Sequence, residues 1–199
     1  DRYRVSTSSV MDARLLEMDV IVLAVKPQQL HAVAESLRVF VKTQLILSVA
    51  AGIRAADLSR WLGGHSKIVR AMPNTPAMIG LGMTGLYAMD AVISAERKLA
   101  ETMMQAVGDC LWVDNESMID AVTAVSGSGP AYVFYFIEAM QEAAMQLGFD
   151  ASQARQLALS TFNGSAQLAK QSEEPVSSLR ERVTSKGGTT YAALCSMDD

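Results

Sequence analysis

The hydrophobic pattern of the first half of the chain alternates between two periods. Short, continuous apolar runs closed by turn-forming residues predict strands at residues 20–25, 45–49, 67–72 and 110–113. Apolar positions spaced three and four residues apart predict helices at residues 28–40, 55–62 and 94–107. Continuous apolar runs are typical of strands buried on both faces of a sheet, and their alternation with helices indicates βαβ units. We therefore expect an α/β domain with a mainly parallel sheet over residues 1–115.

The pattern changes to nearly pure helix after about residue 115. Helices are predicted at residues 131–147, 151–170 and 176–183, and a fourth follows Gly188. Gly148 suits the end of the first of these helices, and Asp150 with Gln153 resembles a capping box for the next. We therefore expect an all-α domain over residues 116–199, which makes the fold class α/β plus all-α.

The predicted helix at residues 131–147 is apolar around most of its circumference. A helix with one face in water carries polar residues on that face, so this helix must be covered on several sides. About 80 residues of helix cannot easily surround it, and we therefore predict a homodimer with interlocked helices. The alternative is a central helix in a monomeric bundle.

The composition excludes several classes of protein. The net charge is −4 and there is no long basic run, which argues against a nucleic-acid binder. No apolar run reaches the roughly 18 residues of a membrane-spanning helix. Cys110 and Cys195 are in neither a metal-ligand nor a disulfide pattern, so we expect no metal and two free thiols in a reducing cytoplasm. We expect His31 and His65 to lie at the surface.

A glycine motif at residues 80–85, Gly-Leu-Gly-Met-Thr-Gly, matches the spacing of a dinucleotide-binding loop. A true dinucleotide loop follows a strand and opens a helix, so that the helix N-terminus meets the pyrophosphate. Here a proline-containing turn precedes the motif and a strand-like segment follows it. We therefore interpret these glycines as serving a tight turn and close backbone packing.

Short, unusual segments follow three of the predicted strands. They are Ala-Val-Lys-Pro at residues 24–27, Ala-Ala-Gly at residues 50–52 and Met-Pro-Asn-Thr-Pro at residues 72–76. In open α/β sheets, ligands bind in the crevice outside the carboxyl ends of the strands. Small residues there let the backbone approach a flat ligand closely, and Asn74 could form a hydrogen bond with a carboxamide.

Two polar segments stand out in the second half. Ser126-Gly127-Ser128-Gly129-Pro130 precedes the long helix, where simple N-capping and tight packing compete with a functional role. Residues 183–190, Val-Thr-Ser-Lys-Gly-Gly-Thr-Thr, lead directly into the last predicted helix. Two glycines, four hydroxyl groups and the unpaired N–H groups of a helix start make an anion site suited to a carboxylate.

Together these motifs resemble the pyrroline-5-carboxylate reductase family. The segments at residues 24–27, 50–52, 72–77, 80–85, 126–132 and 183–190 occur in the order and rough spacing of that family. The resemblance covers essentially the whole chain and implies a Rossmann-like N-terminal domain followed by a helical dimerisation domain. It implies reduction of 1-pyrroline-5-carboxylate to L-proline, the last step of proline biosynthesis, by a cytoplasmic homodimer that can assemble into a ring of dimers.

The resemblance also implies roles for individual residues. The cofactor, NADPH with NADH as the alternative, would be lined by Ala24, Val25, Lys26, Pro27, Ala50, Ala51, Gly52 and, near the nicotinamide, Asn74. The substrate carboxylate would be bound by Ser185, Gly187, Gly188 and Thr189. Thr190 would face the imine nitrogen as the catalytic residue, and Glu116 would border the substrate pocket.

The sequence departs from the family pattern at its start. The first βαβ elements, with the glycine-rich phosphate loop and the segment that distinguishes NADPH from NADH, precede the matched region, and roughly the last helix follows it. We therefore expect this chain alone to bind cofactor weakly and to show little activity.

Two other functions are consistent with the pattern. A β-hydroxyacid dehydrogenase has a similar layout, but its chemistry needs a base, usually a lysine on the helix entering the second domain, and residues 131–147 contain no lysine. A catalytically silent, dimerising protein is the other alternative, although the polar cluster at residues 185–190 has little use in one.

Overall fold

The computed structural model describes residues 5–198, which form two compact units with the boundary in the sequence between Tyr132 and Val133. The first unit contains a five-stranded sheet in the order β1-β2-β3-β4-β5. Its strands are β1 (Val20–Leu23), β2 (Leu45–Ser48), β3 (Ile68–Met72), β4 (Gly82–Ala88) and β5 (Gly108–Trp112). β1, β2 and β3 are mutually parallel, β4 is antiparallel to β3, and β5 is parallel to β4. The expected mainly parallel sheet is thus confirmed, with one reversal after β3.

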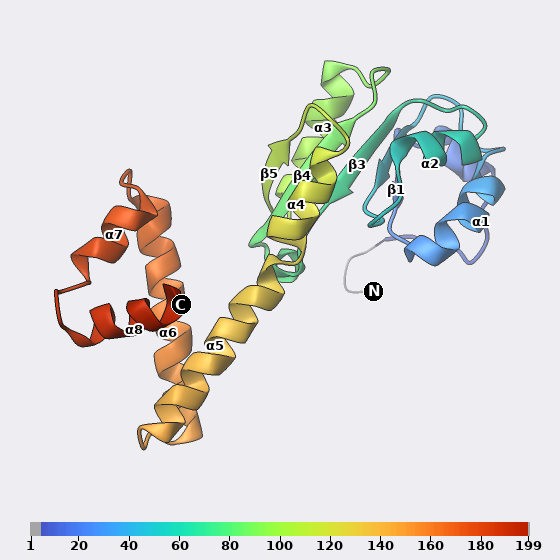
Figure 1. Ribbon diagram of the computed structural model, residues 1–199. Coiled ribbons are helices and arrows are strands. Elements are labelled where there is room, and N and C mark those ends of the chain that lie inside the picture. Colours follow the sequence, from blue (N-terminus) through green and yellow to red (C-terminus); the bar gives the residue numbers. More distant parts are fainter. Residues whose placement is uncertain (1–4, 199) are drawn as a thin grey trace. The chain divides into compact units, whose positions relative to one another are not determined.

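The helices of the first unit cover both faces of this sheet (Figure 1). They are α1 (Pro27–Leu37), α2 (Ala55–Trp61), α3 (Ser94–Gln105) and α4 (Met118–Val122), with short 3-10 helices η1 (Ala13–Glu17) and η2 (Thr75–Ile79). Alternate residues of the central strands point to opposite faces, so Ile46 packs with α1 and α2 while Leu45 and Leu47 pack on the side of α3. Both faces of β2 are therefore buried, as its continuous apolar run predicts.

A π-helix, η3 (Thr123–Gly127), joins α4 to the long helix α5 (Gly129–Gln146). The N–H of Ser128 donates to the carbonyl of Thr123 at 2.8 Å, which is the five-residue spacing of a π-turn. The N-capping interpretation of residues 126–130 is therefore wrong, because helical backbone runs through Ser128 rather than starting after it. A Cβ on Gly127 would lie 2.9 Å from Cε of Met72, the flexible end of that side chain, whereas no atom lies within 4 Å of a Cβ position on Gly129.

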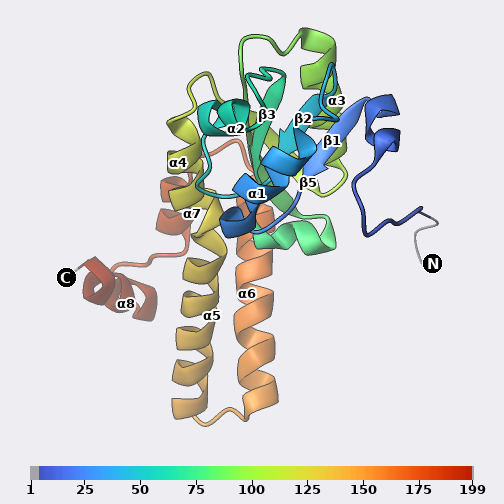
Figure 2. The ribbon, with the colours of Figure 1, turned by 90° about the vertical axis from the view of Figure 1, so that its right-hand side faces the viewer.

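The second unit continues α5 and adds three helices. These are α6 (Ala151–Gln171), α7 (Val176–Arg182) and α8 (Thr189–Asp198). Gly148 adopts φ +101° after α5, and the predicted capping box forms, with the Gln153 N–H donating to Asp150 Oδ1 at 2.9 Å. Figure 2 shows the hairpin that α5 and α6 make through this turn. The predicted helices of this region are confirmed.

His65 is half-buried rather than at the surface, which corrects the expectation for this residue, whereas His31 is exposed. The Nε2 of His65 donates to the carbonyl oxygen of Gln44 at 2.9 Å. Burial disfavours the charged imidazolium and lowers the pKa of His65, although hydrogen bonds to backbone groups partly oppose the shift. The sequence offers no apolar pattern around His65 that could have revealed this burial.

This pKa shift predicts a pH dependence of stability. The unfolded chain binds a proton at His65 below pH of about 6.5, where the folded protein still holds a neutral ring, so protonation favours unfolding. The stabilisation that the neutral His65 ring gives the folded protein is therefore complete above pH of about 6.5, and it is lost as the pH falls below that value. We expect the urea midpoint to fall between pH 7.5 and pH 5.5, and to fall less in His65→Asn. His31→Asn controls for loss of an imidazole, and equal pH dependence in His65→Asn and the native protein would contradict the prediction.

Candidate functional site

The three segments that follow β1, β2 and β3 lie at one edge of the sheet. Their strands are parallel and in register, with Leu23 opposite Ser48 and Ser48 opposite Arg70, so their carboxyl ends share that edge. The N–H of Val49 donates to the carbonyl of Leu23 at 3.1 Å and extends the pairing beyond the strands. The structure therefore brings the three predicted segments together.

The segments themselves leave room for a ligand. Ala24, Lys26, Ala51 and Gly52 are exposed, Val25 and Pro27 are half-buried, and the predicted Ala50 is buried. Pro27 is the first residue of α1, where its missing N–H costs no hydrogen bond. Gly52 adopts φ +74°, and no atom lies within 4 Å of the position of a Cβ there. Its backbone is thus both tightly turned and open to a close approach.

Asn74, the residue expected near the nicotinamide, holds three parts of the first unit together. Its Nδ2 donates to the carbonyl oxygen and to Oγ of Ser126, each at 3.2 Å, and its Oδ1 accepts from the N–H of Met83 at 2.9 Å. Both ends of the side-chain amide are therefore bonded within the protein. Asn74 ties the turn after β3 to β4 and to the π-helix, and sequence reasoning did not anticipate these bonds.

Glu116 lies beside a buried arginine. Its Oε1 accepts hydrogen bonds from the N–H of Ala55 and from a guanidinium nitrogen of Arg70, both at 2.6 Å. Together with Arg54, Ser117 and Asp120, this pair lines a cavity of about 110 Å³. Sequence reasoning missed Arg70, although a charged residue inside an otherwise apolar strand is a signal that a partner must exist, because an unpaired buried charge is costly.

The start of α8 places four of the predicted substrate-binding residues around one tight turn. The N–H of Gly188 donates to the carbonyl of Ser185 at 3.0 Å, and Gly187 between them adopts φ +74°. Thr189 and Thr190 open the helix, and the first turn of an α-helix leaves its N–H groups without partners in the helix.

The hydroxyl groups near this turn fall into two kinds. Ser185, Thr189 and Thr190 are exposed, and their hydroxyls make no hydrogen bond within residues 5–198. Thr184, by contrast, donates to the carbonyl of Arg180 at 2.7 Å. Free hydroxyls and free helix-start amides together form a site that can bind a small carboxylate and donate a further hydrogen bond.

The glycine motif at residues 80–85 is explained by packing. Gly80 ends η2 with φ +73°, and a Cβ on Gly82 would lie 2.8 Å from the carbonyl oxygen of Val107. A Cβ on Gly85 would lie 2.7 Å from Cγ1 of Val122. The motif runs into β4 and not into a helix, which is the structural context expected of a packing motif.

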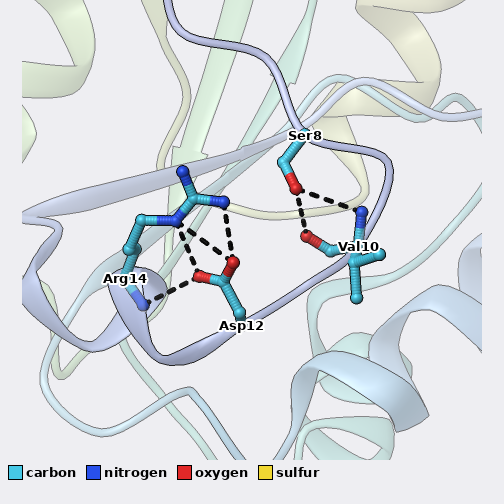
Figure 3. Close-up of polar contacts among 4 residues, drawn as sticks. All are labelled: Ser8, Val10, Asp12 and Arg14. Atoms are coloured by element: carbon cyan, nitrogen blue, oxygen red, sulfur yellow. Dashed lines mark hydrogen bonds and ion pairs between the residues drawn. The ribbon is translucent and has the colours of Figure 1, made fainter.

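A hollow of about 640 Å³ lies elsewhere in the first unit and is lined by residues 6–12, 14, 15 and 18. Figure 3 shows its polar contacts: Asp12 caps η1 by accepting from the Arg14 N–H at 3.0 Å and pairs with the Arg14 guanidinium at 2.7 Å. The hydrogen bonds from Arg14 lower the pKa of Asp12 to about 2. Gln44, at the amino end of β2, donates to the Leu15 carbonyl and so links this segment to that end of the strand. The hollow is therefore not part of the edge where the segments after β1, β2 and β3 lie.

Two other kinds of feature are absent from the described residues. No group of three or more His, Cys, Asp or Glu side chains is arranged to hold a metal ion. Within the same part of the chain, no helix combines the length and apolar character needed to cross a bilayer.

A sheet with loops gathered at the carboxyl ends of its parallel strands, followed by a helical unit, is the organisation of two-part, nicotinamide-dependent oxidoreductases. Residues 116–199 match the family model described as pyrroline-5-carboxylate reductase dimerisation, and residues 1–52 match the model described as NADP oxidoreductase, coenzyme F420-dependent.

Known relatives agree with these matches. The pyrroline-5-carboxylate reductase of Pseudomonas aeruginosa is 50% identical over 179 residues, which cover 89% of this chain and 66% of the relative. That of Haemophilus influenzae is 41% identical over 98% of this chain and 72% of the relative. The solved structure of the Coxiella burnetii enzyme superposes with a TM-score of 0.88 at 44% identity, covering 95% of this chain and 72% of that one.

A second solved structure, the Plasmodium falciparum pyrroline carboxylate reductase with NADP bound, gives a TM-score of 0.86 at 30% identity and covers 97% of this chain and 76% of that one. The chain therefore belongs to the pyrroline-5-carboxylate reductase family. It spans just under two thirds, 66%, of the length of the first relatives that it matches.

The packing role of the glycine motif predicts the effect of Gly85→Ala. The added methyl group meets Val122, and overpacking of this kind costs about 1–3 kcal/mol of unfolding free energy. In the protein at its full natural length, the affinity for NADPH should not change. Urea denaturation and cofactor titration measure the two effects. The matched variant Gly85→Ala/Val122→Ala removes the clashing methyl groups and should regain part of the loss. A stable Gly85→Ala protein with weakened NADPH binding would show instead that the motif binds phosphate.

Proposed function

We propose that the protein reduces the C=N bond of 1-pyrroline-5-carboxylate with a hydride from NADPH and releases L-proline. The observation that carries this proposal is the start of α8, where unpaired helix amides and the free hydroxyls of Ser185, Thr189 and Thr190 surround one tight turn. A small acid with a basic ring nitrogen is complementary to this set of donors. Family membership supports the same reaction.

The substrate carboxylate would be held by the amides and hydroxyls at residues 185–189. A helix N-terminus carries a partial positive charge and aims N–H donors outward, so it favours a carboxylate without any lysine or arginine. Fixing the carboxylate restrains the ring and its imine carbon, which is catalysis by positioning.

The chemistry needs little from the protein beyond this. Hydride adds to the imine carbon and the nitrogen takes up a proton, and the imine becomes a better acceptor when its nitrogen is protonated or hydrogen-bonded. The product amine is more basic than the imine, so no strong base is required. Thr190 would donate a hydrogen bond to this nitrogen, a contribution of about 10²–10⁴-fold for a well-placed general acid.

The cofactor would bind at the carboxyl ends of β1, β2 and β3. The exposure of Ala24, Ala51 and Gly52 supports this, because a flat dinucleotide needs close approach to small residues at the strand ends. NADPH supplies the hydride, with NADH as the alternative. We place the enzyme in the cytoplasm, where its free Cys110 and Cys195 stay reduced.

The role of Thr190 predicts a selective kinetic effect. In the protein at its full natural length, Thr190→Ala should lower kcat about 100-fold or more, because the imine nitrogen loses its donor. Affinity for NADPH should stay within about twofold, since the cofactor is bound by other residues. Steady-state rates and calorimetric titration measure these quantities. Thr184→Ala is the matched control, because the Thr184 hydroxyl already donates to the Arg180 carbonyl. Unchanged turnover in Thr190→Ala would show that Thr190 takes no part in the chemistry.

We also propose that the enzyme is a homodimer built through α5 and its neighbours. On α5, Phe134 and Tyr135 expose 62% and 68% of their surface in the single chain. Further exposed apolar residues of this helix are Tyr132, Val133, Phe136, Met140 and Met145. Exposed apolar surface on this scale marks an interface, and the matching family model is a dimerisation region.

The dimer predicts a change of mass on substitution. Phe134→Asp should convert the dimer to a monomer, because a charge buried in an apolar interface is strongly unfavourable. Thr102→Asp, on the exposed surface of α3, is the control and should leave the dimer intact. Sedimentation equilibrium measures the masses, and a stable monomer of the native protein would contradict the proposal.

A further inference from the structure

The carboxylate of Glu116 joins three parts of the first unit. It is half-buried, with a side chain 22% exposed, and it pairs with Arg70, whose side chain is only 6% exposed. The same oxygen accepts the N–H of Ala55, the first residue of α2. Arg70 lies opposite Ser48, the last residue of β2, in the parallel pairing of β2 and β3. Glu116 and Arg70 therefore flank both ends of the segment that connects β2 to α2.

The cap on α2 has to come from a distant residue. Arg54 occupies the N-cap position, and its side chain offers no acceptor for the first helical N–H groups. Glu116 supplies that acceptor from 61 residues away. At the other end of the segment, Val49 donates to the carbonyl of Leu23, and the N–H of Ala50 donates to Ser48 Oγ at 3.4 Å.

Between these two anchors lie the residues that the proposed function assigns to the cofactor. Ala51 and Gly52 are exposed. Gly52 has a left-handed backbone conformation, and no neighbouring atom lies within 4 Å of its Cβ position. An exposed turn of this kind keeps one conformation only if its ends are fixed. Loss of the Glu116 carboxylate would release the start of α2 and leave the Arg70 guanidinium buried without its partner.

We propose that Glu116 is a positioning residue for the dinucleotide, acting through the segment at residues 50–52, and not a group that contacts the substrate. This inference rests on the proposed function, because it assumes that NADPH binds at these strand ends. A residue that contacts the substrate would change the affinity for the imino acid, whereas a residue that positions the cofactor loop changes only the affinity for NADPH. Glu116 should govern the affinity for NADPH and leave the affinity for the imino acid unchanged.

The chain offers a matched control in Glu96. Its Oε1 pairs with Lys67 at 2.6 Å, its Oε2 accepts the N–H of Ile93 at the start of α3, and its side chain is 17% exposed. It is thus another half-buried carboxylate that both pairs with a base and caps a helix. Ile93 and Lys67 are not part of the segment between β2 and α2. Removal of the Glu96 carboxylate therefore destabilises the fold but keeps the Glu116 contacts with Ala55 and Arg70.

The experiment compares Glu116→Ala, Glu116→Gln and Glu96→Ala with the native protein at its full natural length. Hydrogen exchange by mass spectrometry follows residues 49–58, calorimetry gives the Kd for NADPH, and steady-state rates at saturating NADPH give the KM for the imino acid. In Glu116→Ala, exchange in this segment and the Kd for NADPH should each rise about tenfold or more, as expected when a charged hydrogen bond is lost. The KM for the imino acid should stay within about twofold.

The other two variants complete the test. Glu116→Gln keeps an acceptor oxygen for Ala55 and should fall between the native protein and Glu116→Ala, and it serves as the test if the alanine variant does not fold. Glu96→Ala should speed exchange only near residue 93. A raised substrate KM in Glu116→Gln, with native exchange and native NADPH affinity, would overturn the inference. Failure of the native protein to bind NADPH would instead overturn the proposed function, and the inference with it.

Discussion

An arginine that is buried within a sheet must keep its charge partner, and in this molecule that constraint organises the sheet edge at which we propose that the cofactor binds. Arg70 lies on the central strand β3 and is paired with Glu116 at 2.6 Å. The same carboxylate starts α2, so strand, helix and the loop between β2 and α2 are fixed relative to one another. Glu116 is also the first residue matched by the dimerisation model of the family. One carboxylate thus connects the scaffold of the sheet to the beginning of the helical region.

The chemistry proposed for the second unit requires no buried charged side chain. A helix start provides partial positive charge and N–H donors at no cost in buried charge, so a carboxylate can be bound by backbone and hydroxyl groups alone. Reduction of an imine needs a proton donor of modest strength, and a threonine hydroxyl is one. The absence of lysine from α5 fits this reaction better than the oxidation of a hydroxy acid, which requires a base.

Sequence patterns predicted the elements well and their connections less well. The continuous apolar run of β2 indicates burial on both faces, and the carboxyl ends of β1, β2 and β3 follow from their parallel order. The reversal at β4 depends on pairing between residues distant in the chain, such as Met72 with Gly85 and Val69 with Ala88, and no local pattern encodes it. The π-helix is equally hidden, because its sequence has the ordinary composition of a loop with glycine and serine.

In the predicted site too, features formed by neighbouring residues could be predicted, whereas contacts between distant residues could not. The polar cluster at residues 185–190 is contiguous, so its position at a helix start could be predicted from spacing alone. Asn74 was assigned to the nicotinamide from its place after a strand, and that place could not predict the bonds of its amide to Met83 and Ser126, which lie 9 and 52 residues away. The pairing of Glu116 with Arg70 spans 46 residues. The lone charge in the run of β3 indicated that a partner exists, but only the fold identifies it.

The central claim, that this chain carries the imine-reducing site of its family, is tested most directly by product analysis with two candidate substrates. The protein at its full natural length would be supplied with NADPH and 1-pyrroline-5-carboxylate, and separately with NADP⁺ and a β-hydroxy acid. We expect proline to form in equal amount to the NADPH consumed, with no reduction of NADP⁺ by the hydroxy acid. Oxidation of the hydroxy acid, or no proline under any condition, would contradict it.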